Sequence, residues 1–477
     1  MDAADAGGDG GVPHLVFLPT PGMGHLIPLA EFAKRLVLHH RITATFITGD
    51  VFSKSQMALL DRLPRGIENV VLPDVSLDDI PSNAKAETVI SVCAVRALPA
   101  VRGVLGELKK TTNLVALVSD LFGGFALEVA REFGIRPYIF FTTTGMSLSL
   151  FLRLPELDAQ TSGEYRDLPD LIRLPGCIPL HGSDLLNPIQ DRKNEAYTWL
   201  LRQSSRYRLA AGIFLNSFEG LEGGAIRALT ADPGNPTIYP VGPIVRNGGE
   251  ESDRDSSGCV AWLDEQPRGS VLFVSFGSGG TLPLEQLTEL ALGLEASGER
   301  FLWVVRSPRE KRADSAFFSV HSSNDPFAFL PEGFVERTKR LGLVVSSWAP
   351  QVKILRHEST GGFLTHCGWN SSLESVVHGV PMIAWPLYAE QKMNAVLLVE
   401  DVKVALRPRA GEDGIVGRGE VAQVVKSLME GEDGKRLRER LREVQEEGAR
   451  GLTEGGASYR AIAAAADEWK RACSPAP

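Results

Sequence analysis

A histidine and an aspartate stand after two apolar runs, where their side chains could move a proton. His25 follows HLVFLPTPGMG, and Asp120 closes LVALVSD. The carboxyl ends of parallel strands meet at one edge of a sheet, so these side chains lie close together if the two strands are near each other. Asp120 would then hold His25 in one tautomer, and His25 would act as general base for an incoming hydroxyl. Ordinary helix-capping roles for both residues are the alternatives.

A second group of polar residues lies within LTHCGWNSSLESVV, part of the stretch 348–391. This pattern indicates a strand, a glycine turn at Gly368 and a helix. His366 ends the strand, and Asn370 and Ser371 begin the helix. The free amides of a helix N-terminus, with His366 and Ser371 as added donors, suit a diphosphate. Glu374, one turn into the helix, could accept hydrogen bonds from both hydroxyls of a ribose.

Aromatic and amide side chains in the same stretch could bind a planar base and a sugar. Trp348 follows the apolar run LVVSS and offers a flat face to a base, whose edge Ala349 and Gln351 could contact. Other donors and acceptors suited to sugar hydroxyls come from Trp369, Glu390 and Gln391.

Each of these residues also has an ordinary explanation when it is taken singly. A tryptophan usually packs in a core or on a surface, Glu374 could complete a capping box, and Glu390 could be a solvated acid of a first helical turn. Partners for base, ribose, diphosphate and sugar nevertheless follow one another on successive strand ends. A nucleotide sugar explains them all.

Short apolar runs alternate with helical patterns and must position these residues. Such alternation predicts α/β architecture with parallel sheets covered on both faces. A polar stretch near residue 246 indicates a linker, 307–330 indicates an exposed loop, and two charged amphipathic patterns near the C-terminus indicate helices. The expected strands are 14–19, 42–48, 114–120, 136–142, 270–277, 301–305, 343–348, 362–366 and 381–386.

The chain has 477 residues, which exceeds the ~250–300 at which one hydrophobic core stops growing, so two domains are expected. We expect an N-terminal acceptor-binding domain over 1–245, a linker over 246–259 and a C-terminal domain over 260–455 that binds the nucleotide sugar. The remaining helix, 456–477, is expected to pack back on the N-terminal domain. Facing strand ends would leave a binding cleft between the domains.

Composition narrows the choice of partner and compartment. The net charge is −9 without a basic block, which argues against nucleic acid and anionic membranes. The five cysteines are scattered without metal-ligand spacing, which favours a reducing compartment. The acidic start MDAADAGGDGGV is unlike a signal peptide, and no apolar run reaches the ~18 residues of a membrane span. A cytoplasmic monomer without stable membrane insertion is expected.

Two kinds of cofactor are disfavoured. A dinucleotide fingerprint GxGxxG after the first strand would need glycine at position 27, where the chain has Ile27, and this weighs against a sugar-nucleotide epimerase or dehydrogenase. No Asp-x-Asp pair lies near 348–391, and the nearest candidate, Asp78 with Asp79, belongs to an N-terminal loop. We expect neither metal nor cofactor.

The stretch from Trp348 to Gln391 resembles, almost residue for residue, the signature box of the plant secondary-product UDP-glycosyltransferases, a family 1 group with the GT-B fold. The likeness extends from PHLVFLPTPGMGHLIPLAEFAKRL through VSFGSGGTL to AEQKMNAVLL, and FLWVVRSP and ALRPRAGEDG are most similar to the hydroquinone glucosyltransferase (arbutin synthase) branch. The resemblance implies two Rossmann-like parallel-sheet domains facing across a cleft.

The resemblance also implies a role for each residue that matches the family pattern. His25 is the base and Asp120 its partner. The donor UDP-glucose is expected to contact Ser278, Trp348, Ala349, Gln351, His366, Gly368, Trp369, Asn370, Ser371, Glu374, Glu390, Gln391 and Thr142. Many members carry Asp at position 390, and Gln391 favours glucose over galactose. His366 and the helix N-terminus would neutralise the leaving diphosphate without a metal.

Acceptor selectivity is expected to arise in the N-terminal domain, in an apolar slot lined by Glu87, Leu121, Phe122, Phe141 and Leu186. The sequence thus predicts an inverting UDP-glucose-dependent glucosyltransferase that forms β-glucosides on small phenols, monolignols, xenobiotic phenols or aryl amines. Two alternatives remain: a transferase for flavonoids or terpenoids, and a nucleotide-sugar-binding protein without turnover.

Overall fold

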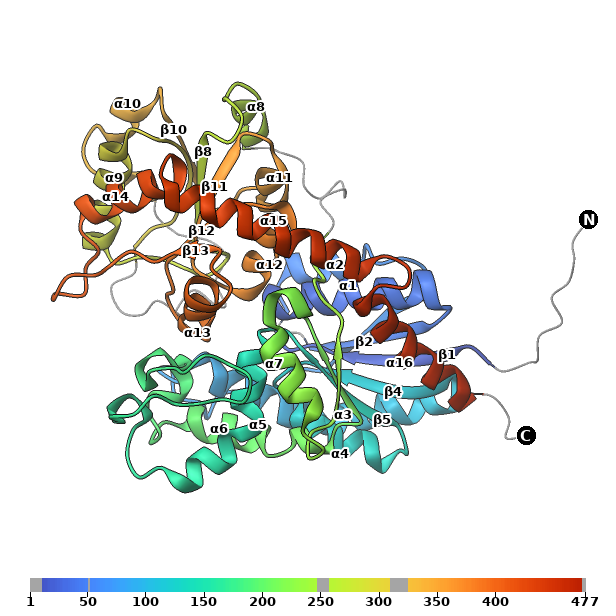
Figure 1. Cartoon of the computed structure of the whole chain (residues 1–477). Helices are drawn as coiled ribbons and strands as arrows, with labels where there is room; N and C mark the ends of the chain where they lie inside the picture. Colours follow the sequence, from blue (N-terminus) through green and yellow to red (C-terminus); the bar gives the residue numbers. More distant parts are fainter. Residues whose placement is uncertain (1–10, 50–51, 247–256, 309–324, 474–477) are drawn as a thin grey trace, which may run out of the picture.

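The computed structural model describes residues 11–49, 52–246, 257–308 and 325–473. Within these ranges the chain forms two parallel β-sheets, each flanked by helices on both faces (Figure 1). This is the α/β arrangement that the alternating sequence pattern predicts. Most of the exposed loop expected at 307–330, and most of the linker expected at 246–259, lie outside the described residues.

The N-terminal sheet has the strand order β3-β2-β1-β4-β5-β6-β7. The chain extends from β1 to one side and then returns to β4 on the other side of β1, so the sheet has a topological switch point between β1 and β4. The strands are β1 (Pro13–Leu18), β2 (Thr43–Gly49), β3 (Ile67–Leu72), β4 (Asn113–Ser119), β5 (Arg136–Phe141), β6 (Gly212–Leu215) and β7 (Thr237–Pro240).

The C-terminal sheet repeats this plan with the order β10-β9-β8-β11-β12-β13. Its switch point lies between β8 and β11, the strand that His366 follows. The strands are β8 (Val271–Ser275), β9 (Arg300–Val305), β10 (Gly342–Ser346), β11 (Thr360–Thr365), β12 (Met382–Ala384) and β13 (Ala405–Leu406).

Helices cover the sheets and carry several of the candidate residues at their N-termini. The α-helices are α1 (Met23–His40), α2 (Lys54–Leu60), α3 (Ala86–Thr111), α4 (Gly124–Glu132), α5 (Gly145–Gln160), α6 (Glu195–Ser204), α7 (Glu219–Ala231), α8 (Cys259–Asp264), α9 (Leu284–Ser297), α10 (Phe334–Thr338), α11 (Gln351–Arg356), α12 (Trp369–His378), α13 (Gln391–Val396), α14 (Arg418–Met429), α15 (Glu432–Leu452) and α16 (Ala457–Cys473). Short 3₁₀ turns and one π turn cover Tyr165–Asp167, Gly182–Asp184, Asn187–Ile189, Tyr207–Leu209, Pro326–Phe329 and Leu397–Asp401.

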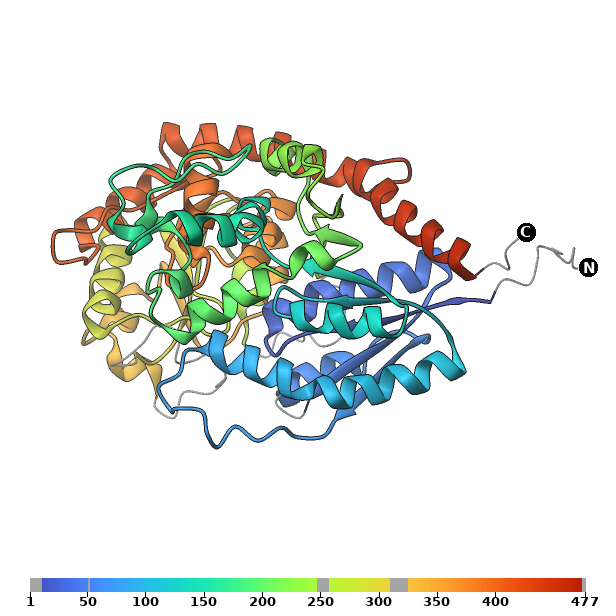
Figure 2. The same ribbon diagram turned by 90° about the horizontal axis from the view of Figure 1, so that it is seen from below.

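The last two helices connect the two halves of the molecule. α15 crosses from the C-terminal sheet, and α16 lies along the N-terminal sheet (Figures 1 and 2), where it contacts β4, β7 and α1. The fully buried Trp469 packs edge-on against Tyr138, at a centroid separation of 5.4 Å. The end of the chain therefore contributes to the N-terminal core.

The long helix α3 departs from one expectation. The sequence analysis found no apolar run long enough to span a bilayer, but α3 has the length and apolar content of such a helix, alone among the described helices. In this structure it packs against α4 and α6. Arg96 and Arg102 interrupt its apolar sequence, and each forms an ion pair with a neighbouring carboxylate.

Candidate active site

His25 and Asp120 are hydrogen-bonded at the switch point of the N-terminal sheet. Strand β1 pairs with β4 so that Leu18 lies opposite Ser119, which brings the loop after β1 beside Asp120. Nδ1 of His25 lies 2.9 Å from Oδ2 of Asp120. The Asp120 side chain is fully buried, whereas that of His25 is 14% exposed. The pair that the sequence suggests is thus assembled, with the histidine on the accessible side.

The surroundings of Asp120 keep it ionised. Burial alone raises the pKa of its carboxyl, but the charge interaction and hydrogen bond with His25, and hydrogen bonds from Thr20, outweigh burial and hold that pKa below its usual value. The other oxygen, Oδ1, accepts a hydrogen bond of 3.0 Å from the backbone N–H of Phe122. A buried carboxylate that accepts this many hydrogen bonds is held in one orientation and remains ionised.

Thr20 is a part of this network that the sequence analysis missed. Its backbone N–H donates to Oδ2 of Asp120 at 2.8 Å, and its hydroxyl donates to the same oxygen. Its position after a predicted strand could have pointed to it, because Thr20 follows β1 by two residues and Asp120 follows β4 by one. A threonine in a glycine-containing loop does not by itself indicate a site. Only the pairing of β1 with β4 shows that Thr20 lies beside Asp120.

Replacing Thr20 with valine is expected to lower kcat about 10- to 150-fold, which corresponds to the ~1.5–3 kcal/mol of one hydrogen bond to a charged group. The KM for either substrate should change little, because Thr20 acts through Asp120. Loss of the hydroxyl also raises the pKa of Asp120, so the acid limb of the pH–rate profile should move to higher pH. Thr20→Ser should restore both kcat and the profile. Unchanged kcat and pH profile in Thr20→Val would contradict this role.

His366 lies in a tight cradle at the end of β11. A side chain at Gly277 would place its Cβ 2.6 Å from the imidazole, and one at Gly368 would place it 2.4 Å away. Gly277 also has φ +74°, a conformation that favours glycine. Nδ1 of His366 is buried and has no hydrogen-bond partner among the described residues. A buried polar atom without a partner is unusual and points to a group that binds there.

His366 was expected to help neutralise a leaving diphosphate, but its surroundings disfavour a positive charge on the imidazole. Desolvation by burial lowers its pKa to about 4, so the imidazole is neutral near pH 7. In this environment His366 offers a diphosphate a hydrogen-bond donor rather than a positive charge. For an anion at this site, the favourable charge interaction would then come from the N-terminus of α12 rather than from His366.

The first turn of α12 is open to an anion. Its N-cap residue Gly368 provides no side-chain cap, so the first backbone N–H groups keep their donor capacity. Ser371 and Glu374 of this helix are joined through Gln351, the first residue of α11, whose Nε2 lies 2.9 Å from Oγ of Ser371 and 2.7 Å from Oε2 of Glu374. Three residues expected to bind the donor thus lie together.

Asn370 links this helix to the N-terminal domain. Its Nδ2 donates to the carbonyl oxygen of Gly24 at 2.9 Å. Pro28, four residues further along α1, has no N–H, so this carbonyl lacks the usual helical partner. Asn370 takes the position of that missing donor. The N-termini of α1 and α12 therefore meet, which brings His25 near the candidate diphosphate site.

Aromatic residues expected to contact the donor occupy two different environments. The Trp348 side chain is 49% exposed, so its face is accessible to a planar base, and the adjacent Ala349 is buried. Trp369 is only 3% exposed, and its Nε1 donates to the carbonyl oxygen of Asn216 at 2.8 Å across the domain interface. Trp369 therefore joins the two domains, a contact that sequence reasoning did not anticipate.

The residues expected around the sugar come from both sheets. Glu390 accepts a hydrogen bond of 3.3 Å from Oγ1 of Thr143, the residue after Thr142 at the end of β5. Oε1 of Gln391 accepts from the backbone N–H groups of Leu387 and Tyr388, so its amide N–H₂ group is the part left for a sugar hydroxyl. Ser278 is exposed in the loop that follows β8, next to the cradle of His366.

The residues expected to line the acceptor slot are only partly brought together. Phe122 lies beside His25, with ring centroids 5.6 Å apart, and Leu121 precedes it. Leu186 is buried at 4% exposure, and Glu87 lies in the first turn of α3. Phe141 has no exposed surface and packs edge-on against Phe151 and Tyr207, so it is a core residue rather than a surface of the slot.

Two observations bear on metal binding. Within the described ranges, no group of three or more histidine, cysteine, aspartate or glutamate side chains is arranged to hold a metal ion. Asp79, one of the two neighbouring aspartates considered from the sequence, forms an ion pair with Arg96 at 2.6 Å. Its carboxylate is thereby engaged in a surface contact.

The sequence matches known proteins along nearly its whole length. It is 56% identical over 465 residues to hydroquinone glucosyltransferase of Rauvolfia serpentina, covering 97% of this chain and 99% of the relative. It is 54% identical over 464 residues to UDP-glycosyltransferase 72B1 of Arabidopsis thaliana, covering 96% of each chain. The sequence model described as "UDP-glucoronosyl and UDP-glucosyl transferase" matches residues 239–432.

Solved structures agree with these relatives. A UDP-glucosyltransferase from Polygonum tinctorium, capable of glucosylating indoxyl and bound to 3,4-dichloroaniline, superposes with a TM-score of 0.89 at 52% identity, covering 96% of this chain and 99% of that one. Phytolacca americana UGT2, complexed with UDP-2fluoro-glucose and pterostilbene, gives 0.88 at 49% identity with the same coverage. The two-domain GT-B fold and the family predicted from the stretch 348–391 are confirmed, and the chain belongs to the plant family 1 UDP-glycosyltransferases.

Proposed function

We propose that this protein is an inverting glucosyltransferase that transfers glucose from UDP-glucose to the hydroxyl group of small phenols and forms β-glucosides. The observation that carries the proposal is the His25–Asp120 pair, held at the edge of the N-terminal sheet where the N-terminus of α12 meets it. A base thus lies next to a site for a leaving diphosphate. One relative is named as a hydroquinone glucosyltransferase, and a solved relative is described as capable of glucosylating indoxyl. Both names support a phenol-like acceptor.

The geometry of the pair supports a specific route for the proton in this proposal. Nδ1 of His25 faces Asp120, so Nε2 is the nitrogen that takes the acceptor's proton. The acceptor oxygen forms a bond to the anomeric carbon while the bond from that carbon to the UDP oxygen breaks on the opposite face. The proton remains on Nε2, and the carboxylate of Asp120 stabilises the imidazolium. Attack opposite the leaving group converts the α-linked donor into a β-glucoside.

The donor is oriented by the residues around α12 and α13. In this proposal Trp348 stacks on uracil, Glu374 accepts from the ribose hydroxyls, and the first turn of α12 with His366 binds the diphosphate. The sugar lies near Thr142, Glu390 and the amide nitrogen of Gln391. We further propose that the protein works in the cytoplasm as a monomer and requires no metal or cofactor.

Mass spectrometry tests the proposal directly. The purified protein, incubated with UDP-glucose and a panel of simple phenols, monolignols, flavonoids and terpenoid alcohols, should add one hexose to the simple phenols most rapidly. UDP-galactose should be a poorer donor, and a chelator should leave the rate unchanged. Preference for flavonoids or terpenoids would reassign the acceptor class. Binding of UDP-glucose without transfer to any acceptor would support the alternative of a binding protein.

The ribose contact leads to a specific prediction for the donor site. Glu374→Ala should weaken donor binding by the ~1.5–3 kcal/mol of a hydrogen bond to a charged group, or about 10- to 150-fold. The KM for the acceptor should change little, because Glu374 lies in the C-terminal domain. Titration with UDP and steady-state kinetics measure both quantities.

A surface glutamate of the same domain provides the control. Glu358 is exposed beyond α11, so Glu358→Ala should leave donor affinity as in the wild type. An unaltered donor KM in Glu374→Ala would show that this carboxylate does not bind the ribose. A parallel loss in both variants would indicate a general change in the domain.

A further inference from the structure

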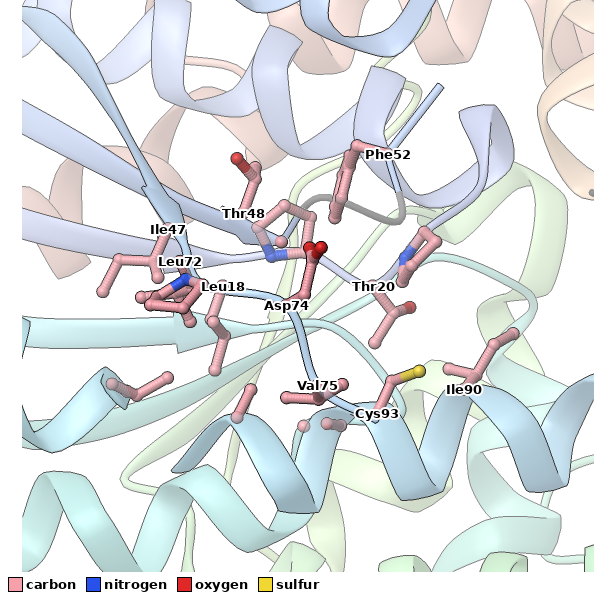
Figure 3. Close-up of a pocket in the computed structure, with 18 residues that line it drawn as sticks. Leu18, Thr20, Ile47, Thr48, Phe52, Leu72, Asp74, Val75, Ile90 and Cys93 are labelled. Atoms are coloured by element: carbon pink, nitrogen blue, oxygen red, sulfur yellow. The ribbon is translucent and has the colours of Figure 1, made fainter. Parts of the chain in front are cut away.

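A cavity lies behind the His25–Asp120 pair, on the α3 side of the N-terminal sheet. Its volume is about 310 Å³. It is partly open and lies between the carboxyl ends of β1, β2 and β3 on one side and α3 on the other (Figure 3). A partly open, mostly apolar pocket of this size is large enough to receive a small ligand. The carboxyl edge of a parallel sheet is also where ligands bind in this class of fold.

The cavity is distinct from the expected acceptor slot. Its lining contains neither His25 nor Asp120, and it shares none of the five residues expected to contact the acceptor. Thr20 forms the wall between the cavity and the pair, because its side chain lines the cavity and its hydroxyl donates to Asp120. A molecule in the cavity would therefore touch the network from behind.

Charge and polarity limit the kind of molecule that the cavity can bind. Most of its surface is apolar, with Leu18 and Ile47 from the sheet and Ile90 from α3. Of the described residues in the lining, Asp74 alone carries a charge. Burial raises the pKa of the Cys93 thiol, which therefore stays neutral. The described part of the lining thus offers one carboxylate and no cation, which disfavours anions.

The polar groups of the cavity are arranged to accept hydrogen bonds. The hydroxyl of Thr20 already donates its proton to Asp120, and that of Thr48 donates to Oδ1 of Asn69 at 3.1 Å. Each hydroxyl oxygen keeps lone pairs that can accept. The best ligand is thus an apolar molecule that carries a neutral donor. A volume at the lower end of the range for ligand sites suits a single ring.

We propose that this cavity is a second binding site, separate from the acceptor slot, for one neutral single-ring phenol whose hydroxyl donates to Thr20. The ring lies between the strand ends and α3, and the hydroxyl lies toward Oγ1 of Thr20. The proposal is independent of the proposed reaction, because it concerns binding and needs no sugar transfer.

Binding of 4-fluorophenol to the full chain, saturated with UDP and without a sugar donor, tests the proposal. Calorimetry counts the bound equivalents, and ¹⁹F NMR distinguishes their environments. Ala97→Leu and Ala94→Leu each place a larger side chain in the cavity from α3, and leucine is compatible with a helix. Ala100→Leu, a partly exposed position of the same helix outside the cavity lining, is the matched control.

The wild type and Ala100→Leu are expected to bind two equivalents, and each cavity variant one, with UDP affinity retained as the sign of intact folding. A single equivalent in the wild type that persists in both cavity variants would overturn the proposal, as would two equivalents in all proteins. A single equivalent that is lost in the cavity variants would support this site and count against the proposed acceptor slot. The outcomes thus separate the two proposals.

Discussion

His25→Ala is expected to lower kcat by about 10²–10⁴-fold, the usual contribution of a positioned general base. The affinity for UDP should stay near that of the wild type, because His25 lies in the first turn of α1 and not in α12, the helix proposed to bind the donor. The acceptor oxygen loses only the group that removes its proton. Steady-state kinetics with UDP-glucose and hydroquinone, together with a UDP titration, measure the two effects separately.

A second histidine on the same helix supplies the control for this experiment. His39 is exposed in the last turn of α1, so His39→Ala should keep full activity. Full activity in His25→Ala would remove this residue from the mechanism. Loss of UDP binding in the same variant would indicate that the contact between α1 and α12 has been disturbed.

The strands that carry the site could be predicted because they are short, apolar and buried. The expected strand 114–120 corresponds to β4, Asn113–Ser119, and 14–19 corresponds to β1, Pro13–Leu18. A polar residue at the end of such a strand has little reason to be there other than chemistry or capping. That made Asp120 conspicuous in the sequence. The sequence analysis could only assume that these two strands are neighbours in the sheet. The structure shows that β1 pairs directly with β4.

Several strands were not predicted, and their composition explains why. β3, Ile67–Leu72, is an edge strand with polar and partly exposed positions, and it lacks a continuous apolar run. β6, β7 and β13 have only 4, 4 and 2 residues, too few for a recognisable period. The first of the two amphipathic stretches predicted near the C-terminus also merges two helices, α14 and α15, which are separated near Gly431.

The contacts between the domains could not be predicted, because they depend on three-dimensional packing. The hydrogen bond from Asn370 to Gly24 joins residues that are 346 positions apart, and that from Trp369 to Asn216 joins residues 153 apart. Trp369 and Asn370 were expected to bind the donor, and the structure shows that they also link the domains. The same limit applies to Phe141, since an apolar residue at a strand end can face a slot or a core.

The negative charge of Asp120 both orients His25 and stabilises its protonated form. Asp120→Asn is therefore expected to lower kcat by roughly 10³–10⁴-fold, as loss of charge at a triad aspartate does. Oδ2 accepts from His25 and Thr20, and Oδ1 accepts from the backbone of Phe122. In either orientation an asparagine would turn its N–H₂ group toward a donor. His25 would lose both its fixed tautomer and the charge that stabilises its protonated form.

Steady-state kinetics and UDP titration again separate catalysis from donor binding for Asp120→Asn. UDP affinity should be retained, because Asp120 lies at the end of β4 in the N-terminal sheet. Asp61→Asn, an exposed change at the C-cap of α2, should retain full activity. A kcat for Asp120→Asn within about tenfold of the wild type, well below the loss for a triad aspartate, would mean that His25 needs neither the charge nor the orientation that Asp120 provides. His25 would then act as a base without help from Asp120. The Asp120 carboxylate, which accepts four hydrogen bonds, would instead serve to hold the loops at the switch point together.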